Sequence, residues 1–319
     1  MTGSSTLFVI INPTSGGGAG VRMSAEAARE LGGREVPYEV HLTKAPGHAT
    51  DLAREAVLAR AKAVVAVGGD GTLHEVANGV LAARALDPSI ATPMGLVPVG
   101  TGNDFVKVVA GASPRRTAWA TVVHGSVHWF DAGLARWNGE AEYFVNAAGT
   151  GIDVEVVRQM GPHRGTQGPI AYVLALLRAL RHYEAVPVRL VADGQNYERR
   201  IMTVAVANGR CIGGTFRICP QAVPDDGLFD VCAVEALPLL RSLFTAARIV
   251  RGTHAALPSV SSLRARRVEL SVPAGAQLFF QLDGELREPA GTHRLTLELL
   301  PHALPVLSRA GRSEAASVA

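Results

Sequence analysis

The sequence has few cysteines, little net charge and no long hydrophobic segment. Its three cysteines, Cys211, Cys219 and Cys232, include no C-x-x-C pair, which argues against a disulfide framework or a zinc site. The formal net charge of +3 is too small, and the arginines are too scattered, to indicate a nucleic-acid-binding protein. No apolar run reaches the roughly 18 residues that a membrane span needs. We therefore expect no transmembrane segment and contact with lipid only from the membrane surface.

Two common nucleotide-binding signatures are also missing. The glycine-rich stretch at residues 12–18, NPTSGGG, lacks the Gly-Lys-Ser/Thr ending of a P-loop, and no G-x-G-x-x-G follows any strand that we predict. A Rossmann dinucleotide site is therefore poorly supported. The first residues, MTGSSTLFVIINP, do not have the basic and then apolar regions of a secretory leader, and we expect a cytoplasmic protein.

The sequence that is present predicts two domains. Its 319 residues are 48% hydrophobic and 18% charged, which is typical of a globular chain with a well-buried core. Up to residue 128, predicted strands (6–11, 38–42, 63–67 and 94–99) alternate with predicted helices (19–31, 49–61 and one ending near 85), which indicates a Rossmann-like α/β domain with a parallel sheet. Residues 129–293 read as a β-rich domain of short strands, one of them at 142–148, with two helices at 169–183 and 238–251. A last strand at 294–300 begins a C-terminal return, 294–319, to the first domain.

The clearest candidate site follows the third predicted strand. Val64 to Val67 end in Gly68, Gly69, Asp70 and Gly71, and then Thr72 opens a helix. Glycines let a phosphate approach the backbone, Thr72 is suited to cap the helix, and the free N–H groups of the helix favour an anion. Asp70 would repel bare phosphate, but its position makes sense if it holds a cation that bridges to phosphate oxygens. The alternative is a glycine turn without chemical function.

Two more carboxylates follow strands of the predicted sheet. The loop at 100–104 supplies the hydroxyl of Thr101 and the carboxylate of Asp104, and Asp131 lies near the junction of the two domains. Taken singly, each carboxylate is typical of a solvated surface group. Three of them around one ligand fit a hydrated Mg²⁺ ion, which keeps several waters and takes few direct carboxylates.

Three further features have both a plain and a functional interpretation. The turn that contains Asp283 and Glu285 is either an ordinary hairpin or the source of a general base that accepts a proton from an attacking alcohol. Residues 223–228, VPDDGL, are either a turn or a site for a structural cation. The two helices of the β-rich half are amphipathic and basic, which fits core packing or docking on an anionic membrane.

Taken together, these segments resemble the catalytic domain of the diacylglycerol kinase family of soluble bacterial lipid kinases, whose relatives include sphingosine and ceramide kinases. The matching segments occur in family order and span nearly the whole chain. They are NPTSGGG (12–18), Thr43 with GHA (47–49), GGDGTLHEV (68–76), PVGTGNDF (98–105), DAG (131–133), YFVNAAGTGID (143–153), PDDGLFDV (224–231) and LDGE (282–285).

The resemblance implies a two-domain fold akin to NAD kinases and phosphofructokinases, with ATP in the cleft between the domains and Mg²⁺ beside it. The residues that it assigns to the nucleotide are Asn12, Pro13, Thr14, Ser15, Gly16, Thr43, Gly68, Gly69, Asp70, Gly71, Thr72, Leu73, His74 and Thr101. It assigns a Mg²⁺-linked carboxylate network to Asp70, Asp104 and Asp131, and a structural Mg²⁺ site to Asp226 with the carbonyls of Val223 and Leu228. Asp283 and Glu285 match the position of the proton acceptor in the family; we favour Asp283 as the base and keep Glu285 open.

The predicted function is ATP-dependent phosphorylation of a hydroxyl of diacylglycerol or a related lipid at a membrane surface. We expect replacement of Asp70 or Asp283 by Asn to abolish transfer and leave folding intact. The sequence departs from the family at Gly17 and Gly18, where Lys or Arg is usual, and at His74, where Asn is common. Two alternatives are an NAD kinase, which shares the GGDG loop, and a nucleotide-binding regulator that has lost catalysis. An exposed edge strand in the β-rich half is compatible with a homodimer.

Overall fold

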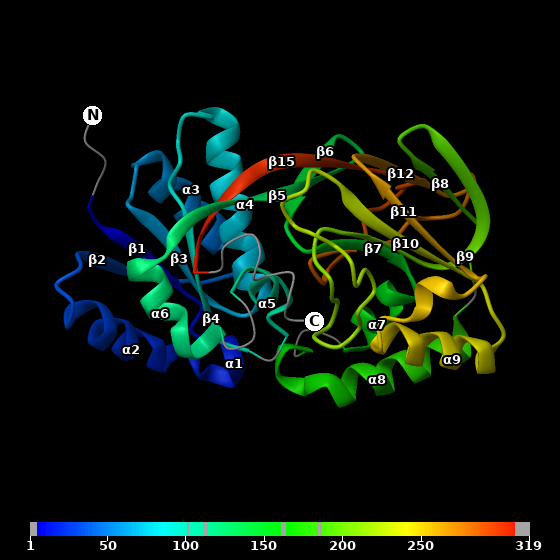
Figure 1. Ribbon diagram of the computed structural model, residues 1–319, viewed down its shortest axis with the longest axis horizontal. Helices are drawn as coiled ribbons and strands as arrows, with labels where there is room; N and C mark the ends of the chain where they lie inside the picture. The colour runs from blue at the N-terminus through cyan, green and yellow to red at the C-terminus, as the bar shows by residue number, and fades with distance from the viewer. Residues whose placement is uncertain are drawn as a thin grey trace. The chain divides into compact units, whose positions relative to one another are not determined.

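Strands buried on both faces form the centre of the N-terminal unit (Figure 1). The computed structural model describes residues 5–100, 102–110, 114–160, 164–183, 185 and 187–309. The chain divides into unit 1, residues 1–130 with 302–319, and unit 2, residues 131–301. These boundaries lie at 130/131 and 301/302, where the sequence analysis placed them at 128/129 and 293/294. No helix in the described part of the chain is long and apolar enough to cross a membrane.

Unit 1 contains a parallel sheet with the strand order β2–β1–β3–β4. Every residue of β3 is buried, as its unbroken run of Ala and Val predicts for a strand covered on both faces. The elements of this unit are β1 (Leu7–Ile11), α1 (Ser15–Gly18), α2 (Gly20–Gly32), β2 (Tyr38–Leu42), α3 (His48–Leu58), β3 (Ala63–Gly68), α4 (Asp70–Leu86), β4 (Met94–Pro98), α5 (Asp104–Ala110) and α6 (Pro114–His124).

Helices pack closely against this sheet. Met23 and Leu31 of α2 and Trp119 of α6 belong to the same buried cluster as alternate residues of β1 and β3. Helices α3 and α4 contact each other at Gly79, where an added Cβ would lie only 2.3 Å from the carbonyl oxygen of Thr50. A larger residue at 79 would therefore push the two helices apart.

Unit 2 is a β-sandwich with helices packed on one of its sheets. Strand β5 (Ser126–Trp137) crosses from unit 1, and β15 (Arg294–Ser308) crosses back. The other elements are β6 (Glu140–Phe144), β7 (Ala147–Gly151), α7 (Ile152–Met160), α8 (Arg164–His182), β8 (Pro187–Ala192), β9 (Gln195–Ala207), β10 (Phe229–Glu235), α9 (Leu239–Val250), the 3₁₀ helix η1 (His254–Ala256), β11 (Val260–Ala265), β12 (Arg267–Ser271), β13 (Phe280–Leu282) and β14 (Glu285–Arg287).

The long strand β9 belongs to both layers of this sandwich, because it pairs with β8 in its first half and with β7 and β10 in its second half. Aromatic side chains fill the interior: Phe144 stacks on Phe229 with ring centroids 5.5 Å apart, and Trp137 meets Phe280 edge-on at 5.0 Å. A second buried cluster joins β7, β9 and β10 to α7, α8 and α9.

The predicted architecture is confirmed: an α/β unit with parallel strands precedes a β-rich unit. Several predicted elements were wrong in detail. The strand expected at 142–148 is two strands, β6 and β7, interrupted at Val145 and Asn146, and β15 continues eight residues beyond the expected end at 300 to Ser308. Helix α7 and strand β11 were not predicted, because their short apolar stretches carry no clear period.

Candidate functional site

The predicted nucleotide residues of unit 1 follow the strands of its parallel sheet. Asn12 follows β1, Thr43 follows β2 and Gly69 follows β3. The strands are in register, with Ile11 opposite both Leu42 and Val67, so these positions lie at one edge of the sheet. That edge is where open α/β sheets bind ligands.

Asp70 connects the two glycine-rich loops of this edge. It is the first residue of α4, and its carboxylate accepts backbone N–H groups from the loop after β4: Oδ2 from Asn103 at 2.7 Å and Oδ1 from Asp104 at 3.0 Å. Asp70 therefore positions the 102–104 backbone, a role that the sequence did not reveal.

Asn12 connects the first glycine-rich loop to α4. Its Nδ2 donates to Thr72 Oγ1 at 3.1 Å, and its Oδ1 accepts both the backbone N–H of Thr14, at 3.0 Å, and the hydroxyl of Thr14, at 2.8 Å. The prediction that Thr72 caps α4 was wrong. The helix begins at Asp70 with Gly69 as its N-cap, and Thr72 is buried in the first turn as the partner of Asn12.

The glycines in these loops are required by the backbone. Gly16 and Gly17, within the short turn α1, have left-handed φ angles of 60° and 68°, and a Cβ on Gly68 would lie 2.4 Å from Thr72 Oγ1.

The remaining predicted nucleotide residues fall into three groups. Leu73 and His74 are buried in the first turns of α4. Pro13, Ser15 and Gly71 are in the two loop–helix connections, and Thr43 is half-buried with its N–H bonded to the carbonyl of Ile11 at 2.9 Å. Thr101 lies outside the described residues.

The loop that Asp70 holds is chemically suited to a hard cation. Asp104 is buried, and Lys107 Nζ lies 3.8 Å from its Oδ1. The side-chain oxygen Oδ1 of Asn103 is buried and has no hydrogen-bond partner among the described residues. Carboxylate and amide oxygens are the ligands that Mg²⁺ prefers, and an orphaned buried oxygen indicates a missing donor or ion. The residues of this loop thus fit Mg²⁺.

Asp283 in unit 2 is held by three backbone amides. Its Oδ2 accepts the N–H of Val145 at 2.9 Å, and its Oδ1 accepts those of Asn146 at 2.8 Å and Ala147 at 3.0 Å. Asp283 has a left-handed φ of 50°, as the first residue of the turn between β13 and β14. The turn expected from the sequence is thus present, and it also supports the irregular stretch between β6 and β7.

Glu285 begins β14 and is half-buried. Two residues later, Arg287 forms a two-point ion pair with Glu142, with Nε 2.7 Å from Oε2 and Nη2 against Oε1. Burial lowers the pKa of Arg287, but the Glu142 pair and the charges of Glu285 and Asp283 outweigh it and raise the pKa above its ordinary value. The carboxylates of Asp283 and Glu285 in this turn are therefore partly offset by the positive charge of Arg287.

Asp131 is completely buried and holds the loop at 224–227. Its Oδ2 accepts the N–H of Gly227 at 2.7 Å, its own N–H donates to the carbonyl of Pro224 at 2.7 Å, and its carbonyl accepts Nδ2 of Asn208 at 2.8 Å. All of these contacts lie within unit 2, whereas Asp70 and Asp104 belong to unit 1. The proposed network of Asp131 with Asp70 and Asp104 stays a prediction.

Asp226 has an arginine partner. Its Oδ2 accepts Nη2 of Arg264, and its Oδ1 accepts the backbone N–H of Leu228 at 3.1 Å. The Nε of the same guanidinium is 3.8 Å from Oδ2 of Asp230, whose pKa burial raises despite this neighbour. Arg264 thus bonds one of the two carboxylate oxygens of Asp226, and the structural Mg²⁺ site at Val223, Asp226 and Leu228 stays a prediction.

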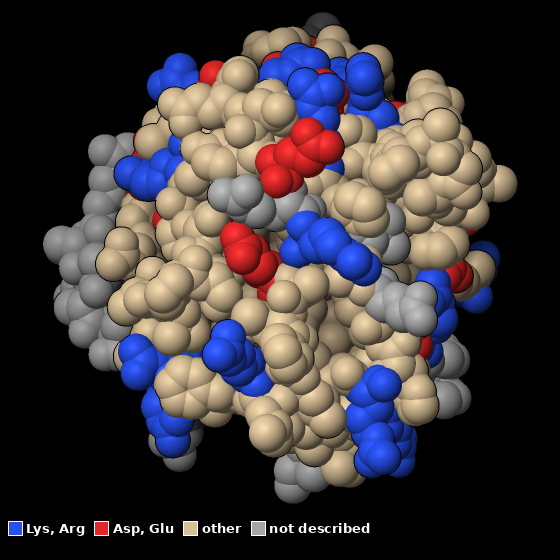
Figure 2. Space-filling model, turned by 90° about the vertical axis from the view of Figure 1, so that its right-hand side faces the viewer, with Lys and Arg blue, Asp and Glu red and all other residues tan. Residues whose placement is uncertain are grey.

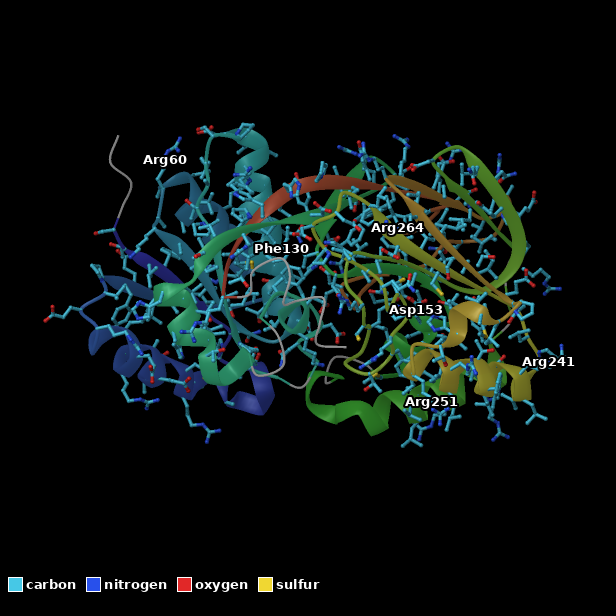
Figure 3. All side chains as sticks on the ribbon, in the orientation of Figure 1. Arg60, Phe130, Asp153, Arg241, Arg251 and Arg264 are labelled. Atoms are coloured by element: carbon cyan, nitrogen blue, oxygen red, sulfur yellow. The ribbon has the colours of Figure 1, made fainter. Side chains whose placement is uncertain are left out.

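Asp153 is a half-buried acid of α7 whose environment could not be predicted from the sequence (Figure 3). Burial raises its pKa to about 6, although Nε2 of Gln281 and Oγ1 of Thr203 each lie 3.4 Å from its carboxylate oxygens. The Oε1 of Gln281 in turn accepts the N–H of Gly284 at 2.6 Å. Asp153 therefore contacts the Asp283 turn through one side chain.

A cavity of about 100 Å³ lies in unit 2. Its lining includes Thr150, Tyr183 and Phe279. Burial and the charge of Asp153 raise the pKa of Tyr183 to about 12.

Comparison with known proteins identifies the family. Residues 6–135 match the model of the diacylglycerol kinase catalytic domain, and residues 146–308 match that of the YegS C-terminal NAD kinase beta sandwich-like domain. The chain is 31% identical to "Diacylglycerol kinase" of Bacillus subtilis (strain 168) over 87% of its length and 88% of that protein's. It is 30% identical to "Probable lipid kinase YegS-like" of Stenotrophomonas maltophilia (strain K279a), covering 92% and 93% of the two chains.

A crystal structure from Bacillus anthracis str. Sterne has the same fold. Its TM-score is 0.78 at 24% sequence identity, and the match covers 96% of both chains. With both halves of the chain matched in order, and with relatives of at least 30% identity over most of its length, the protein belongs to the family of diacylglycerol kinases and YegS-like lipid kinases.

Proposed function

We propose that the protein transfers the γ-phosphate of ATP to a hydroxyl of diacylglycerol or a related lipid. Membership of the lipid kinase family makes it a phosphotransferase. The observation that carries the specific proposal is the contact of Asp70 with the 103–104 backbone, which joins two glycine-rich loops at the ligand-binding edge of a parallel sheet.

The edge of unit 1 is suited to the triphosphate of ATP. The backbone N–H groups at the start of α4 attract anions, and the left-handed Gly16 and Gly17 present backbone without side chains. In the first glycine-rich loop, Gly17 and Gly18 stand where the family usually has Lys or Arg. Lys107, near Asp104, supplies a positive charge to this edge of the sheet. Asn12 keeps the first loop and α4 together.

Asp70, Asp104 and the amide oxygen of Asn103 would hold Mg²⁺, which would supply positive charge against the phosphates. In unit 2, Asp283 is proposed to orient the acceptor hydroxyl and take its proton, with Glu285 as the other carboxylate of the same turn. The acceptor is proposed to be reached at a membrane surface, and pairing of exposed edge strands would give a homodimer.

The test is transfer of label from γ-labelled ATP, with Mg²⁺, to a total lipid extract, to diacylglycerol and, separately, to NAD. We expect a labelled phospholipid and no labelled NADP. The variant D70N should lose transfer. D51N is the matched control, because Asp51 is an exposed acid in the first turn of α3, paired only loosely with Arg54 at 3.6 Å. Labelled NADP would make the protein an NAD kinase; ATP binding without transfer to any lipid would make it a regulator.

A further inference from the structure

Helix α9 exposes most of its large apolar residues and buries one of them, Ile249. A surface helix normally buries its large apolar residues and exposes its polar ones. Here Ser242 and Thr245 are buried at 2% exposure each, whereas Leu240 is 81% exposed and Phe244, one turn further on, is 57% exposed. The hydroxyl of Ser242 donates to the carbonyl of Leu237 at 3.0 Å, so its burial is satisfied. The apolar face of α9 therefore points away from the core of its own unit.

Helix α8 repeats this arrangement in the part whose side chains are described, residues 173–182. It buries the small Ala175 and Ala179 and exposes Leu174 and Leu177. The two helices contact each other and pack on the same core cluster (Figure 1). Twelve large apolar side chains are exposed among the described residues, and seven of them belong to α8 and α9. We call this surface the α8–α9 face. It consists of Val173, Leu174, Leu177, Leu239, Leu240, Phe244 and Val250.

The charge around the α8–α9 face has one sign. Neither helix contains an acidic residue. Five arginines accompany the apolar side chains: Arg178, Arg181, Arg241, Arg248 and Arg251. Figure 3 labels Arg241 and Arg251, near the two ends of α9, and Figure 2 shows blue side chains around an uncharged area in the lower part of that view. None of the five forms an ion pair with an acidic residue in the described part of the chain, and Arg248 donates to the carbonyl of Thr253 at 2.8 Å.

We propose that the α8–α9 face docks on a bilayer that contains anionic phospholipid. Leucine and phenylalanine side chains enter the boundary between headgroups and acyl chains, while the arginines remain at the level of the phosphates. An apolar groove of a protein partner would use the same leucines, but it would not require a face free of acidic residues and bordered by five arginines. The inference rests on the proposed function in one respect: docking brings unit 2 to the surface where a lipid acceptor is found.

The experiment measures co-sedimentation of the full chain with vesicles of phosphatidylcholine, with and without phosphatidylglycerol, in the absence of ATP. The wild type should bind the anionic vesicles and lose most binding in high salt or on phosphatidylcholine alone. The variant L240S/F244S should bind at least about tenfold more weakly, because each side chain loses the transfer of its apolar surface. The variant R241Q/R251Q should bind about tenfold more weakly or worse, since each charge contributes roughly fivefold.

Matched controls come from unit 1. Leu86 is 71% exposed at the end of α4, and Arg22 is an exposed residue of α2. L86S and R22Q should bind vesicles like the wild type. Equal binding by L240S/F244S and wild type would overturn the proposal. The proposal would also be overturned if the wild type formed a dimer and bound no vesicles, and L240S/F244S were a monomer. The α8–α9 face would then be an interface between copies of the chain.

A second readout separates docking from catalysis. Activity is measured on diacylglycerol in vesicles and in micelles of an uncharged detergent, which present the lipid without an anionic surface. We expect L240S/F244S to lose vesicle activity and retain micelle activity. If no lipid is phosphorylated in either form, the proposed function fails, yet the sedimentation result still decides whether the α8–α9 face binds membranes.

Discussion

Replacement of Asp283 by Asn should destabilise unit 2 in addition to any effect on chemistry. Asn tolerates the left-handed φ of 50° at this position, so the variant isolates the side chain. Its single oxygen can replace Oδ1, which accepts the N–H groups of Asn146 and Ala147, but its Nδ2 then faces the N–H of Val145. One charge-assisted bond is lost and two donors oppose each other.

The expected cost is about 2–3 kcal/mol, since a hydrogen bond to a charged group contributes about 1.5–3 kcal/mol. For a unit of this size, that lowers the melting temperature by about 4–10 °C. The measurements are urea unfolding and calorimetry, followed by kcat at a temperature where both proteins are folded. An unchanged melting temperature would refute the structural reasoning. Full kcat in the folded variant would refute the role of Asp283 as base.

Asp193 provides the matched control for this experiment. It also precedes a glycine, has a left-handed φ of 44°, and accepts the backbone N–H groups of Arg266, at 3.0 Å, and Arg267, at 2.9 Å. It is exposed and belongs to none of the family motifs, so D193N should cost less stability, about 1 kcal/mol, and leave kcat unchanged. The sequence led us to expect D283N to fold normally; the structure changes that expectation.

Three further substitutions test other contacts. D70N should lose one of the two amide bonds to the 103–104 backbone and weaken ATP binding by about tenfold, with faster amide hydrogen exchange at Asn103 as the direct readout. Burial raises the pKa of Asp153 from 3.8 to about 6. The protonated acid therefore favours folding below pH 4, and this contribution to stability is lost as the pH rises through about 6. In urea unfolding, D153N should be more stable than wild type by about 3 kcal/mol at pH 8 and equally stable near pH 4. G68A would place a Cβ 2.4 Å from Thr72 Oγ1 and should lower the free energy of unfolding by about 1–3 kcal/mol; an unchanged urea midpoint would contradict the close packing of β3 on α4.

The sequence predicted the parallel half of the fold well, for a physical reason. Strands such as β3, expected at 63–67 and found at Ala63–Gly68, are short apolar runs bounded by glycine or polar residues and followed by a helix. The same reasoning failed at 142–148, where no glycine or proline marks the break between the two strands at Val145 and Asn146. Their N–H groups bond to Asp283, more than 130 residues away, and local pattern contains no information about such a partner.

The candidate site, like the fold, could be predicted from the sequence only in part. The motifs located the carboxylates, because glycine and aspartate after buried strands are local signals. They did not reveal that Asn12 donates to Thr72, that Arg264 pairs with Asp226, or that Asp153 lies beside Gln281. Each of those contacts joins segments between 38 and 128 residues apart in the chain.

Three acids of the predicted catalytic and metal sites, Asp70, Asp131 and Asp283, share one structural property: each accepts backbone N–H groups from a distant segment. A carboxylate fixed by amides keeps its orientation without a ligand, which is what a preorganised site requires. The same bonds mean that removing the charge disturbs the loop that the carboxylate holds. Loss of activity in an Asp→Asn variant therefore does not by itself establish a catalytic role in this fold. The role is established only where kcat falls by more than the accompanying loss of stability explains, which is why a control such as D193N is needed.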